Sequence, residues 1–448
     1  MLDLTKLALQ MQGISQHLAQ EAAASRIRLE RAQNLLTLAQ GRQASLLALQ
    51  AQWHDRLGFT AAEPVEPLTT RCPVPIPPKV QSVIATDGSQ IAPNHHEIAY
   101  CYLINIGRIA LHYGQGRHPL LDSVPEVVYQ PEDLYISRQW GISTEEWMGH
   151  RRTVAESQQL ADLAEALQPA EYAFGPLSDD GINHADNGGT DNGDANDAGT
   201  DNGDANDAGT DNGIGLDNAH DRALTRPPTI ALTDGSLIYW FLEALPGDAR
   251  DRLLPPILAA WDRLKTLQVP LVGYLSASRS SEALNFLRLQ SCPKDEPDCQ
   301  THCSGQTDQA PCRVFAPLRD ATFWSSQLQP GERGPLWRSH ARILDHYSPD
   351  QQIYFCHLHG GAEVARVEFP AWVAQDSALL DRSLSLTLAQ IQKGYGYPVA
   401  LAEAHNQAVV RGGDRQRFFA LLEQQMIRAG LKNIGTSYKE TRKRGSIA

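Results

Sequence analysis

The sequence lacks any run of 18 consecutive apolar residues, so it offers no candidate for a membrane-spanning helix. It also lacks the charged and then apolar start of a secretory signal, because it begins Met-Leu-Asp-Leu-Thr-Lys. We therefore expect a cytoplasmic protein without membrane contact. With 448 residues, 42% of them hydrophobic, the chain can bury a sizeable core and is long enough for two or three domains.

Basic residues and glutamate are missing from one long stretch. Residues 179–221 contain twelve aspartates and no Lys, Arg or Glu, so the rest of the chain accounts for only −1 of the formal net charge of −13. From Arg411 to the end, nine Lys or Arg face three acidic residues, a net charge of +6. This basic end, which includes Lys439 and Arg442, can contact phosphate, although a solvated basic helix explains the charge equally well. The overall acidity therefore does not exclude a nucleic-acid enzyme.

The acidic stretch belongs to an insert at 178–227 with an internal repeat. Its ten residues 190–199 recur identically at 200–209, and a third copy starts at Thr210. Almost nothing in the insert can form a core, so we expect a disordered loop. It lacks the closing glutamate and the flanking helices of an EF-hand, which argues against a calcium site.

The N-terminal residues 1–56 place Leu, Ile and Met at helical spacing. This pattern predicts one long helix or a helical hairpin, broken near Gly13 or Gly41, whose apolar stripe packs on the body of the protein or on a second copy. Residues 57–80 contain six prolines and are expected to form an extended linker.

Residues 81–430 show the element order of an RNase H-like domain. Three closely spaced strand candidates favour an antiparallel meander, and helices and strands then alternate. The expected fold is therefore a mixed sheet, an antiparallel meander plus parallel strands, flanked by helices and followed by a basic tail at 431–448. The expected strands are 82–87, 97–106, 107–113, 228–234 and 269–276, and the expected helices are 143–167, 249–267 and 280–290.

Two strands end in the same tripeptide. Residues 83–90 read Val-Ile-Ala-Thr-Asp-Gly-Ser-Gln, and residues 229–236 read Thr-Ile-Ala-Leu-Thr-Asp-Gly-Ser. In an RNase H-like order these strands are neighbours, which places Asp87 beside Asp234. Two carboxylates about 4 Å apart repel by roughly 4 kcal/mol at an effective dielectric of 20, and a divalent cation would offset this repulsion. We interpret the pair as a metal site; the alternative is ordinary Asp-Gly turn chemistry.

Four of the seven cysteines gather in residues 291–313. In a cytoplasmic chain such a cluster suggests a structural zinc or iron–sulfur clasp, and free thiols or a redox disulfide are the alternatives. The other three, Cys72, Cys101 and Cys356, are isolated and are expected to be small core or surface residues. The clustered residues, with His302 among them, are Cys292, Cys299, Cys303 and Cys312.

A C-terminal segment supplies a candidate nitrogen ligand. Tyr397 and Pro398 precede a helical stretch that carries His405. A lone histidine in a helix is usually structural. One imidazole among carboxylates suits Mg²⁺ or Mn²⁺, with a preference for Mn²⁺.

These motifs, in this order, resemble the NurA family of DNA-end-processing nucleases. The likeness covers residues 80–430 and rests on two Asp-Gly-Ser strand ends, Arg152-x3-Glu156 on the helix between them, and the Tyr-Pro-x-x-Leu-x-x-Ala-His segment. The resemblance implies an RNase H-like fold, a homodimer, and manganese-dependent 5′-to-3′ exonuclease and single-strand endonuclease activity. It also implies a HerA-type hexameric ATPase as partner in DNA end resection and double-strand break repair.

Carried over by position, the resemblance implies a metal-binding catalytic set of Asp87, Glu156, Asp234 and His405. Glu165 on the same helix is the alternative to Glu156. Many relatives have a lysine after the strand where this chain reads Ser-Ala-Ser-Arg, so Arg279 is expected, with Arg152, to contact phosphate. The rival interpretations are a catalytically retired subunit that binds DNA or a partner, and another metal-dependent phosphoesterase.

Overall fold

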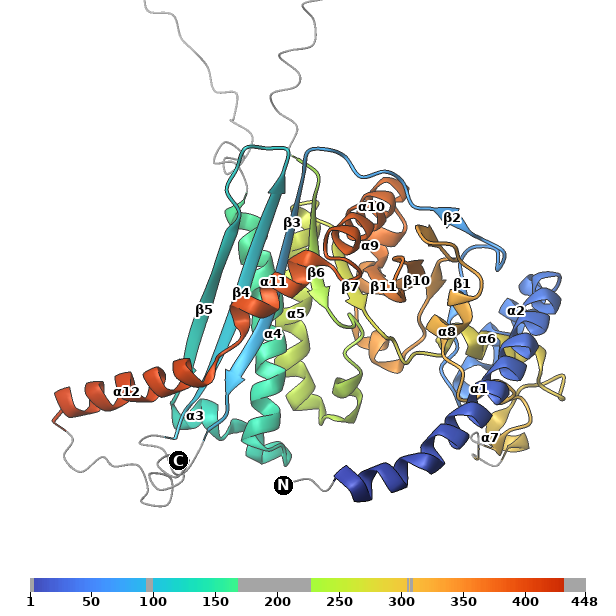
Figure 1. The fold of residues 1–448 in the computed structure, drawn as a ribbon, viewed down its shortest axis with the longest axis horizontal. Coiled ribbons are helices and arrows are strands. Elements are labelled where there is room, and N and C mark those ends of the chain that lie inside the picture. The colour runs from blue at the N-terminus through green and yellow to red at the C-terminus, as the bar shows by residue number, and fades with distance from the viewer. Residues whose placement is uncertain (1–3, 94–99, 168–226, 304–305, 307–308, 431–448) are drawn as a thin grey trace, which may run out of the picture. The chain divides into compact units, whose positions relative to one another are not determined.

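The computed structural model describes residues 4–93, 100–167, 227–303, 306 and 309–430. The insert expected at 178–227, except its last residue, and the tail expected at 431–448 lie outside these ranges. Eleven strands in the described residues form one sheet, whose main path is β1-β9-β10-β11-β7-β6-β3-β4-β5 (Figure 1).

The meander consists of β3 (Gln81–Ile91), β4 (Tyr102–Tyr113) and β5 (Leu120–Val128), all antiparallel. The expectation of separate strands at 97–106 and 107–113 is wrong, because β4 runs through both. Gly107, at the boundary between the two expected strands, lies inside β4. The third meander strand is β5, an edge strand that tolerates Pro125 because an edge has unused hydrogen-bonding positions.

The expected neighbours at the centre of the sheet are confirmed. Strand β6 (Thr229–Asp234) pairs in parallel with β3, and β7 (Leu271–Leu275) pairs in parallel with β6. Thr86 is in register with Thr233, so Asp87 and Asp234 are the next residues on the two strands.

Beyond β7 the sheet continues with strands that the sequence did not predict. Strand β11 (Val364–Pro370) is antiparallel to β7, and β10 (Ile353–His359) is antiparallel to β11. The linker at 57–80 joins this side as two short strands, which pair with two equally short ones. These are β1 (Glu63–Pro64) with β9 (Trp337–Arg338), and β2 (Cys72–Pro73) with β8 (Glu332–Arg333).

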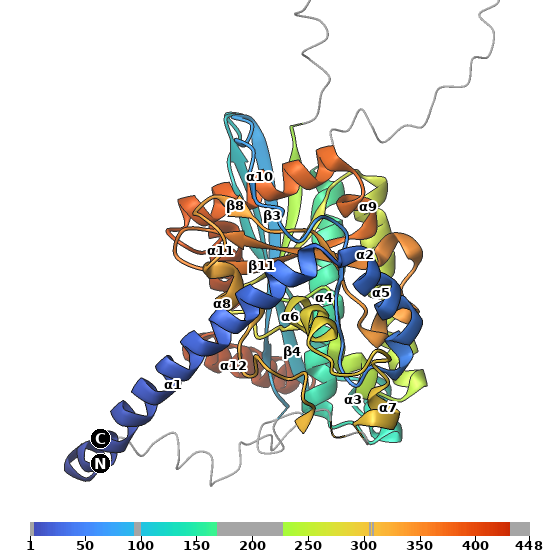
Figure 2. The same ribbon diagram turned by 90° about the vertical axis from the view of Figure 1, so that its right-hand side faces the viewer.

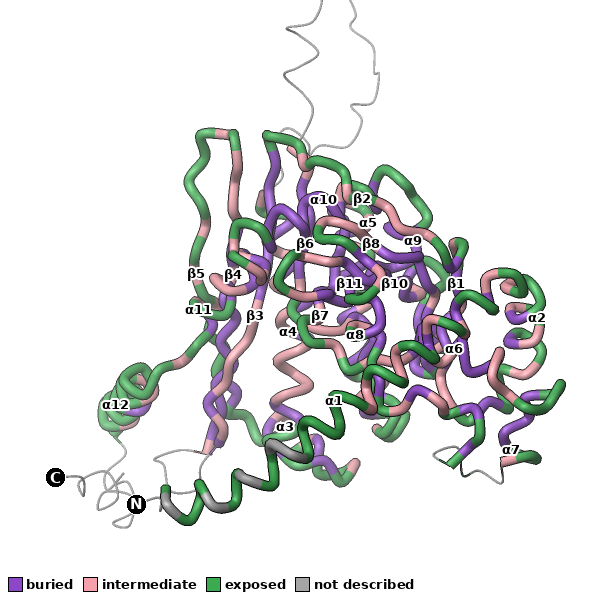
Figure 3. The backbone as a smooth tube through the Cα atoms, turned by 45° about the vertical axis from the view of Figure 1, so that its right-hand side comes forward, coloured by how far each residue is buried: buried purple, intermediate pink, exposed green. Residues whose placement is uncertain are grey.

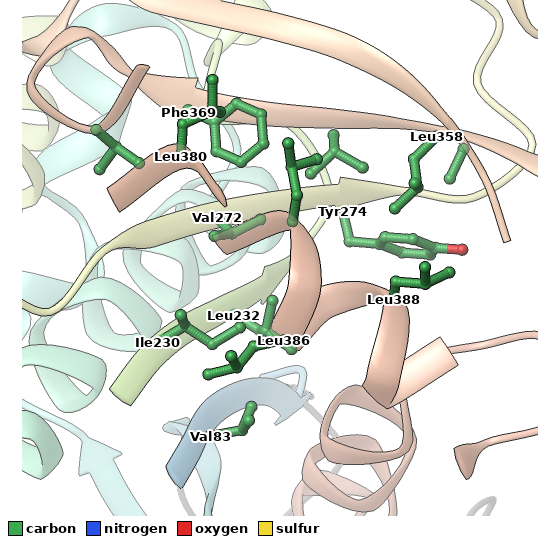
Figure 4. Packing of buried hydrophobic residues seen from close by; sticks show 14 of the residues in the cluster. Val83, Ile230, Leu232, Val272, Tyr274, Leu358, Phe369, Leu380, Leu386 and Leu388 are labelled. Atoms are coloured by element: carbon green, nitrogen blue, oxygen red, sulfur yellow. The ribbon is translucent and has the colours of Figure 1, made fainter. Parts of the chain in front are cut away.

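Helices cover both faces of the central strands (Figures 1 and 2). On one face α4 (Thr144–Ala166) packs on β3 and on α5 (Gly247–Thr266). On the other lie α10 (Ser377–Lys393) and α11 (Val399–Ala408). Figure 4 shows Leu386 and Leu388 of α10 among the apolar side chains of the central strands.

The N-terminal segment is two helices, α1 (Leu4–Gln40) and α2 (Gln43–Trp53), with the break at the second expected glycine, Gly41. The C-terminal part of α1 and α2 pack against α6 (Glu282–Gln290) and α8 (Asp320–Ser325). The N-terminal part of α1 is exposed (Figure 3).

The remaining helices are short or terminal. A longer helix, α12 (Gly412–Arg428), follows α11 and seats Phe419 against Ile91 and Leu103. Within the described ranges no helix is long and apolar enough to cross a membrane. The short α-helices are α3 (Pro131–Leu134), α7 (Cys299–His302) and α9 (Ala371–Ala374), and the 3₁₀ turns are His54–Arg56, Ile136–Trp140, Trp240–Ala244, Arg342–His346 and Pro349–Gln351.

Candidate active site

Strand alternation decides which way each strand-end acid points. Val83 and Ala85 face the α10–α11 side, so Asp87, two residues further, faces the same side. Ile230 and Leu232 direct Asp234 to that side in the same way. The two carboxylates therefore project from adjacent parallel strands toward α11.

Helix α11 brings His405 to Asp87. The Nδ1 atom of His405 lies 2.8 Å from Oδ2 of Asp87, while Oδ1 of Asp87 accepts a hydrogen bond from the Gly88 N–H at 2.8 Å. An ionised carboxylate can only accept hydrogen bonds, so the donor in this contact is an N–H group at Nδ1. In a neutral imidazole, the other nitrogen, Nε2, is then available to a ligand. The His405 side chain is 68% exposed.

The position of α11 depends on Gly107 in β4. A Cβ atom at Gly107 would lie 2.5 Å from the carbonyl oxygen of Ala404 and 2.5 Å from the amide nitrogen of Ala408. The end of α11 is also held by Asn105, whose Nδ2 donates to the Ala408 carbonyl at 2.8 Å, and by the Ser89 hydroxyl, which donates to the same oxygen. Gly107 thus allows the close approach that places His405.

Glu156 reaches the site from α4, on the opposite face of the sheet. A Cβ atom at Gly88 would lie 2.5 Å from Oε1 of Glu156 and 2.6 Å from Cγ of Arg152, so the glycine of the first Asp-Gly-Ser motif makes room for both side chains. The Thr86 hydroxyl fixes this part of α4 by donating to the Glu156 carbonyl at 3.0 Å. Four elements, β3, α4, β6 and α11, therefore converge where β6 ends. Asp87 itself lies inside β3, which continues to Ile91, so the expectation that this strand ends at residue 87 is wrong.

The pKa of Glu156 is raised by burial and by two neighbouring acids. Burial is the main cause that raises its pKa to about 7, and the charges of Asp87 and Asp234 raise it further. Arg152, whose Nε lies 3.2 Å from Oε1 of Glu156, opposes this shift.

The pKa of Asp234 is raised as well. Its side chain is reached by solvent, yet the surrounding protein raises its pKa, mainly by desolvation and also through the charge of Asp87. A hydrogen bond from the Tyr397 hydroxyl and the nearby His405 act in the opposite direction. Tyr397 itself packs edge-on against Tyr274, with ring centroids 5.6 Å apart. The sequence motif contained Tyr397, but we had not expected it to contact an acid.

The donor set fits a hard divalent cation in its chemistry. Oxygen ligands with one imidazole suit Mg²⁺ or Mn²⁺. A cation would also relieve the repulsion between the acids, which adds to desolvation in raising the pKa of Glu156 and of Asp234. The side chains as placed do not yet form a coordination shell, because Asp87 and His405 contact each other directly. No three Asp, Glu, His or Cys residues in the described part of the chain are arranged to hold a metal ion.

The NurA domain family model matches residues 81–410, more than half of the chain. This chain belongs to the NurA family, a family of nucleases.

Among solved structures, the chain is similar to the crystal structure of the NurA nuclease from Sulfolobus solfataricus. The two share 11% sequence identity with a TM-score of 0.43, over 86% of this chain and 93% of that one. No curated protein sequence matches.

Of the two α4 glutamates expected as candidates for the site, Glu156 is the one next to Asp87 and Asp234. Glu165 is engaged elsewhere, since both of its oxygens lie 2.6 Å from the Arg263 guanidinium. Arg279 lies exposed on the loop after β7. Lys439 and Arg442 lie outside the described residues.

A buried ion network beside the NurA site was not predicted. The Arg366 guanidinium lies 2.6 Å from Glu368 and 2.7 Å from Glu282. The second oxygen of Glu368 accepts hydrogen bonds from the Ser236 hydroxyl at 2.9 Å and the Leu237 N–H at 2.7 Å, which anchors the turn that follows Asp234. No sequence motif indicates this network, because Glu282 and Ser236 are far from Arg366 and Glu368 in the chain.

The four clustered cysteines are close enough to affect one another. Burial and the neighbouring thiols raise the pKa of Cys292 and of Cys303, and all four are free thiols. In the described residues these thiols are not arranged as a group that could hold a metal ion. The metal clasp therefore stays a prediction.

Proposed function

We propose that this chain is a divalent-metal-dependent DNA nuclease that hydrolyses phosphodiester bonds. The observation that supports it is the convergence of Asp87, Asp234, Glu156 and His405, from both faces of the sheet, at the end of β6 beside β3. Excess negative charge at such a point disfavours a purely structural role, because structural carboxylates are normally balanced by partners.

The residues that would hold Mn²⁺ or Mg²⁺ are these four. The ion, when bound, would lower the pKa of a water and stabilise the leaving oxygen. The chain's own groups prepare that chemistry. Asp87 fixes the tautomer of His405 so that Nε2 is presented, Tyr397 orients the Asp234 carboxylate, and Arg152 offsets part of the charge on Glu156.

The finer parts of the proposal come from the family resemblance. They are 5′-to-3′ exonuclease and single-strand endonuclease activity in the cytoplasm, in DNA end resection and double-strand break repair, with a HerA-type hexameric ATPase. A homodimer is part of the same proposal. The exposed apolar stripe of α1 supports it, since a second copy could cover Leu4, Leu7, Met11, Ile14 and Leu18.

A catalytically retired subunit that binds DNA or a partner is the second candidate. It is favoured by the replacement of the usual lysine with Ser276–Arg279 and by the direct contact between Asp87 and His405.

The test is digestion of end-labelled linear single- and double-stranded DNA with Mn²⁺, Mg²⁺ or EDTA. We expect metal-dependent shortening from an end, lost in Asp87→Ala and in His405→Ala. Glu165→Gln is the matched control, since it removes an acid from the same helix but outside the site. Full activity in Asp87→Ala would refute the assignment. No activity with any metal, with or without the ATPase, would favour the retired subunit.

A further inference from the structure

A cavity of about 750 Å³ opens beside Asp234, between the turn after β6 and the loop after β7. Asp234 and Trp240 line one side, and Ser278, Arg279 and Asn285 line the other. Small-molecule sites commonly have volumes of roughly 300–1,000 Å³, so the cavity is large enough for one nucleotide.

Trp240 is an exposed aromatic residue in an otherwise buried segment. Its neighbours Leu237, Ile238 and Leu242 are buried, whereas the Trp240 side chain is 41% exposed. The turn that carries it is held firmly, because the Leu237 N–H and the Ser236 hydroxyl donate to buried Glu368. The indole is therefore an ordered aromatic surface at the wall of the cavity.

Arg279 supplies the positive charge. It is exposed, and within the described part of the chain no acid pairs with its guanidinium. Hydrogen bonds to Glu363 hold the loop that carries Arg279. The Ala277 N–H donates to Oε2 of Glu363 at 3.2 Å, and the Tyr274 hydroxyl donates to Oε1 at 3.0 Å. Ala277 adopts φ +47°, a left-handed conformation that is unfavourable for alanine and that such contacts maintain.

The two acids beneath the cavity already share a cation. Arg366 pairs with both Glu282 and Glu368 in the floor. The groups left to attract a ligand are therefore the strand-end acids at one end, where a phosphodiester would react, and Arg279 and Trp240 beside them. A flat aromatic surface and an unpaired guanidinium next to a reactive centre suit one base and one phosphate.

We propose that this cavity holds the unpaired nucleotide adjacent to the scissile bond, with its base stacked on Trp240 and its phosphate bound by Arg279. The proposal rests on the proposed function and names the substrate of that same site. A base inside a duplex cannot stack on Trp240 without leaving its partner, so the cavity selects single-stranded or frayed DNA ends. Stacking is available to every base, so the selection is tolerant of sequence.

The experiment measures binding in EDTA, so that it does not depend on cleavage. The probes are an end-labelled thymidine oligonucleotide and a blunt duplex, and the readout is the Kd from fluorescence anisotropy. Trp240→Ala should weaken oligonucleotide binding by about 5- to 150-fold. Trp240→Phe should restore most of it, and neither variant should change duplex binding.

Two further arms isolate the base and the phosphate. A single abasic position at the bound nucleotide should weaken binding to the wild type but add little in Trp240→Ala. Arg279→Gln should lower the slope of log K against log salt by about 0.7, whereas Arg252→Gln, an exposed arginine on α5, should not.

The proposal would be overturned if wild type, Trp240→Ala and Trp240→Phe bound the oligonucleotide with the same Kd. It would also be overturned if Trp240→Ala weakened duplex binding as much as oligonucleotide binding. A chain that shows these binding effects but never cleaves DNA would refute the nuclease function alone. A chain that cleaves normally without these effects would refute the cavity proposal alone.

Discussion

The strand-end site (Asp87, Glu156, Asp234 and His405) and the buried ion network (Glu282, Arg366 and Glu368) hold carboxylates in different electrostatic conditions. In the network, Glu282 and Glu368 each pair with Arg366 and use their second oxygen for further hydrogen bonds. In the strand-end site, the pKa values of Glu156 and Asp234 are raised partly by neighbouring acids. Acids that are fully paired hold a structure together, whereas unbalanced acids are retained for a ligand.

The largest effect expected from this comparison is on stability. Arg366→Met removes the only cation shared by Glu282 and Glu368, and it should lower the free energy of unfolding by about 3–5 kcal/mol, because two buried carboxylates lose their partner. Asp87→Asn removes one of the repelling acids and should leave stability unchanged or slightly higher. Urea unfolding of both variants measures the difference.

The same two variants separate stability from activity. Asp87→Asn should lose roughly 10²- to 10³-fold or more in DNA cleavage, although it folds as well as the wild type. If Asp87→Asn were the less stable of the two, the strand-end acids would be structural and the contrast would be wrong.

The next effect concerns the close approach of α11. Gly107→Ala introduces a methyl group 2.5 Å from backbone atoms of Ala404 and Ala408, so the helix and His405 must move. We expect at least about tenfold slower cleavage with a loss of stability of roughly 1–3 kcal/mol. Gly149→Ala on α4 is the matched control, since no atom lies within 4 Å of its added Cβ.

Gly149→Ala should keep full activity and gain up to about 1 kcal/mol in stability from helix propensity. Normal cleavage by Gly107→Ala would show that His405 tolerates displacement, and its place in the strand-end site would then need revision.

Asp320 is the intermediate case between the two groups. It is buried and caps α6 by accepting hydrogen bonds from the Ala283 and Leu284 N–H groups, yet burial raises its pKa to about 6, with Glu282 raising it and Arg366 lowering it. Because the folded pKa lies above the ordinary value, the protonated acid is favoured in the fold. Stability should therefore fall as pH rises from about 4 to about 6.

Asp320→Asn removes this titration and retains an oxygen acceptor for the cap. Relative to the variant, the wild type should lose about 2–3 kcal/mol of unfolding free energy across that pH range. Unfolding curves of both proteins at several pH values measure the difference. If the unfolding free energies of wild type and Asp320→Asn differed by the same amount at every pH between 4.5 and 7.5, Asp320 would be ionised in the fold throughout this range.

The proximity of Asp87 and Asp234 could be predicted from the sequence. A repeated tripeptide marks both acids, and the order of the expected elements makes their two strands neighbours. The buried ion network could not be predicted, because Arg366 and Glu282 are joined only by the pairing of β11 with β7. The boundary expected at residue 107 was wrong, because Gly107 lies inside β4 and serves the close approach of α11.

The smallest effect on the nuclease reaction is expected from the cysteine loop. Its thiols resemble the strand-end acids, since each of Cys292 and Cys303 has a pKa raised partly by its neighbours, and a bound cation would reverse that effect. We expect purified protein to carry zinc or iron that Cys312→Ser removes, with Tm lowered by a few degrees and cleavage unchanged. Cys72→Ser, outside the cluster, should keep the metal. If the purified protein carried no metal and had the same Tm as Cys312→Ser, these thiols would be packing residues. Proximity between ionisable groups would then not be sufficient to identify a metal site in this fold.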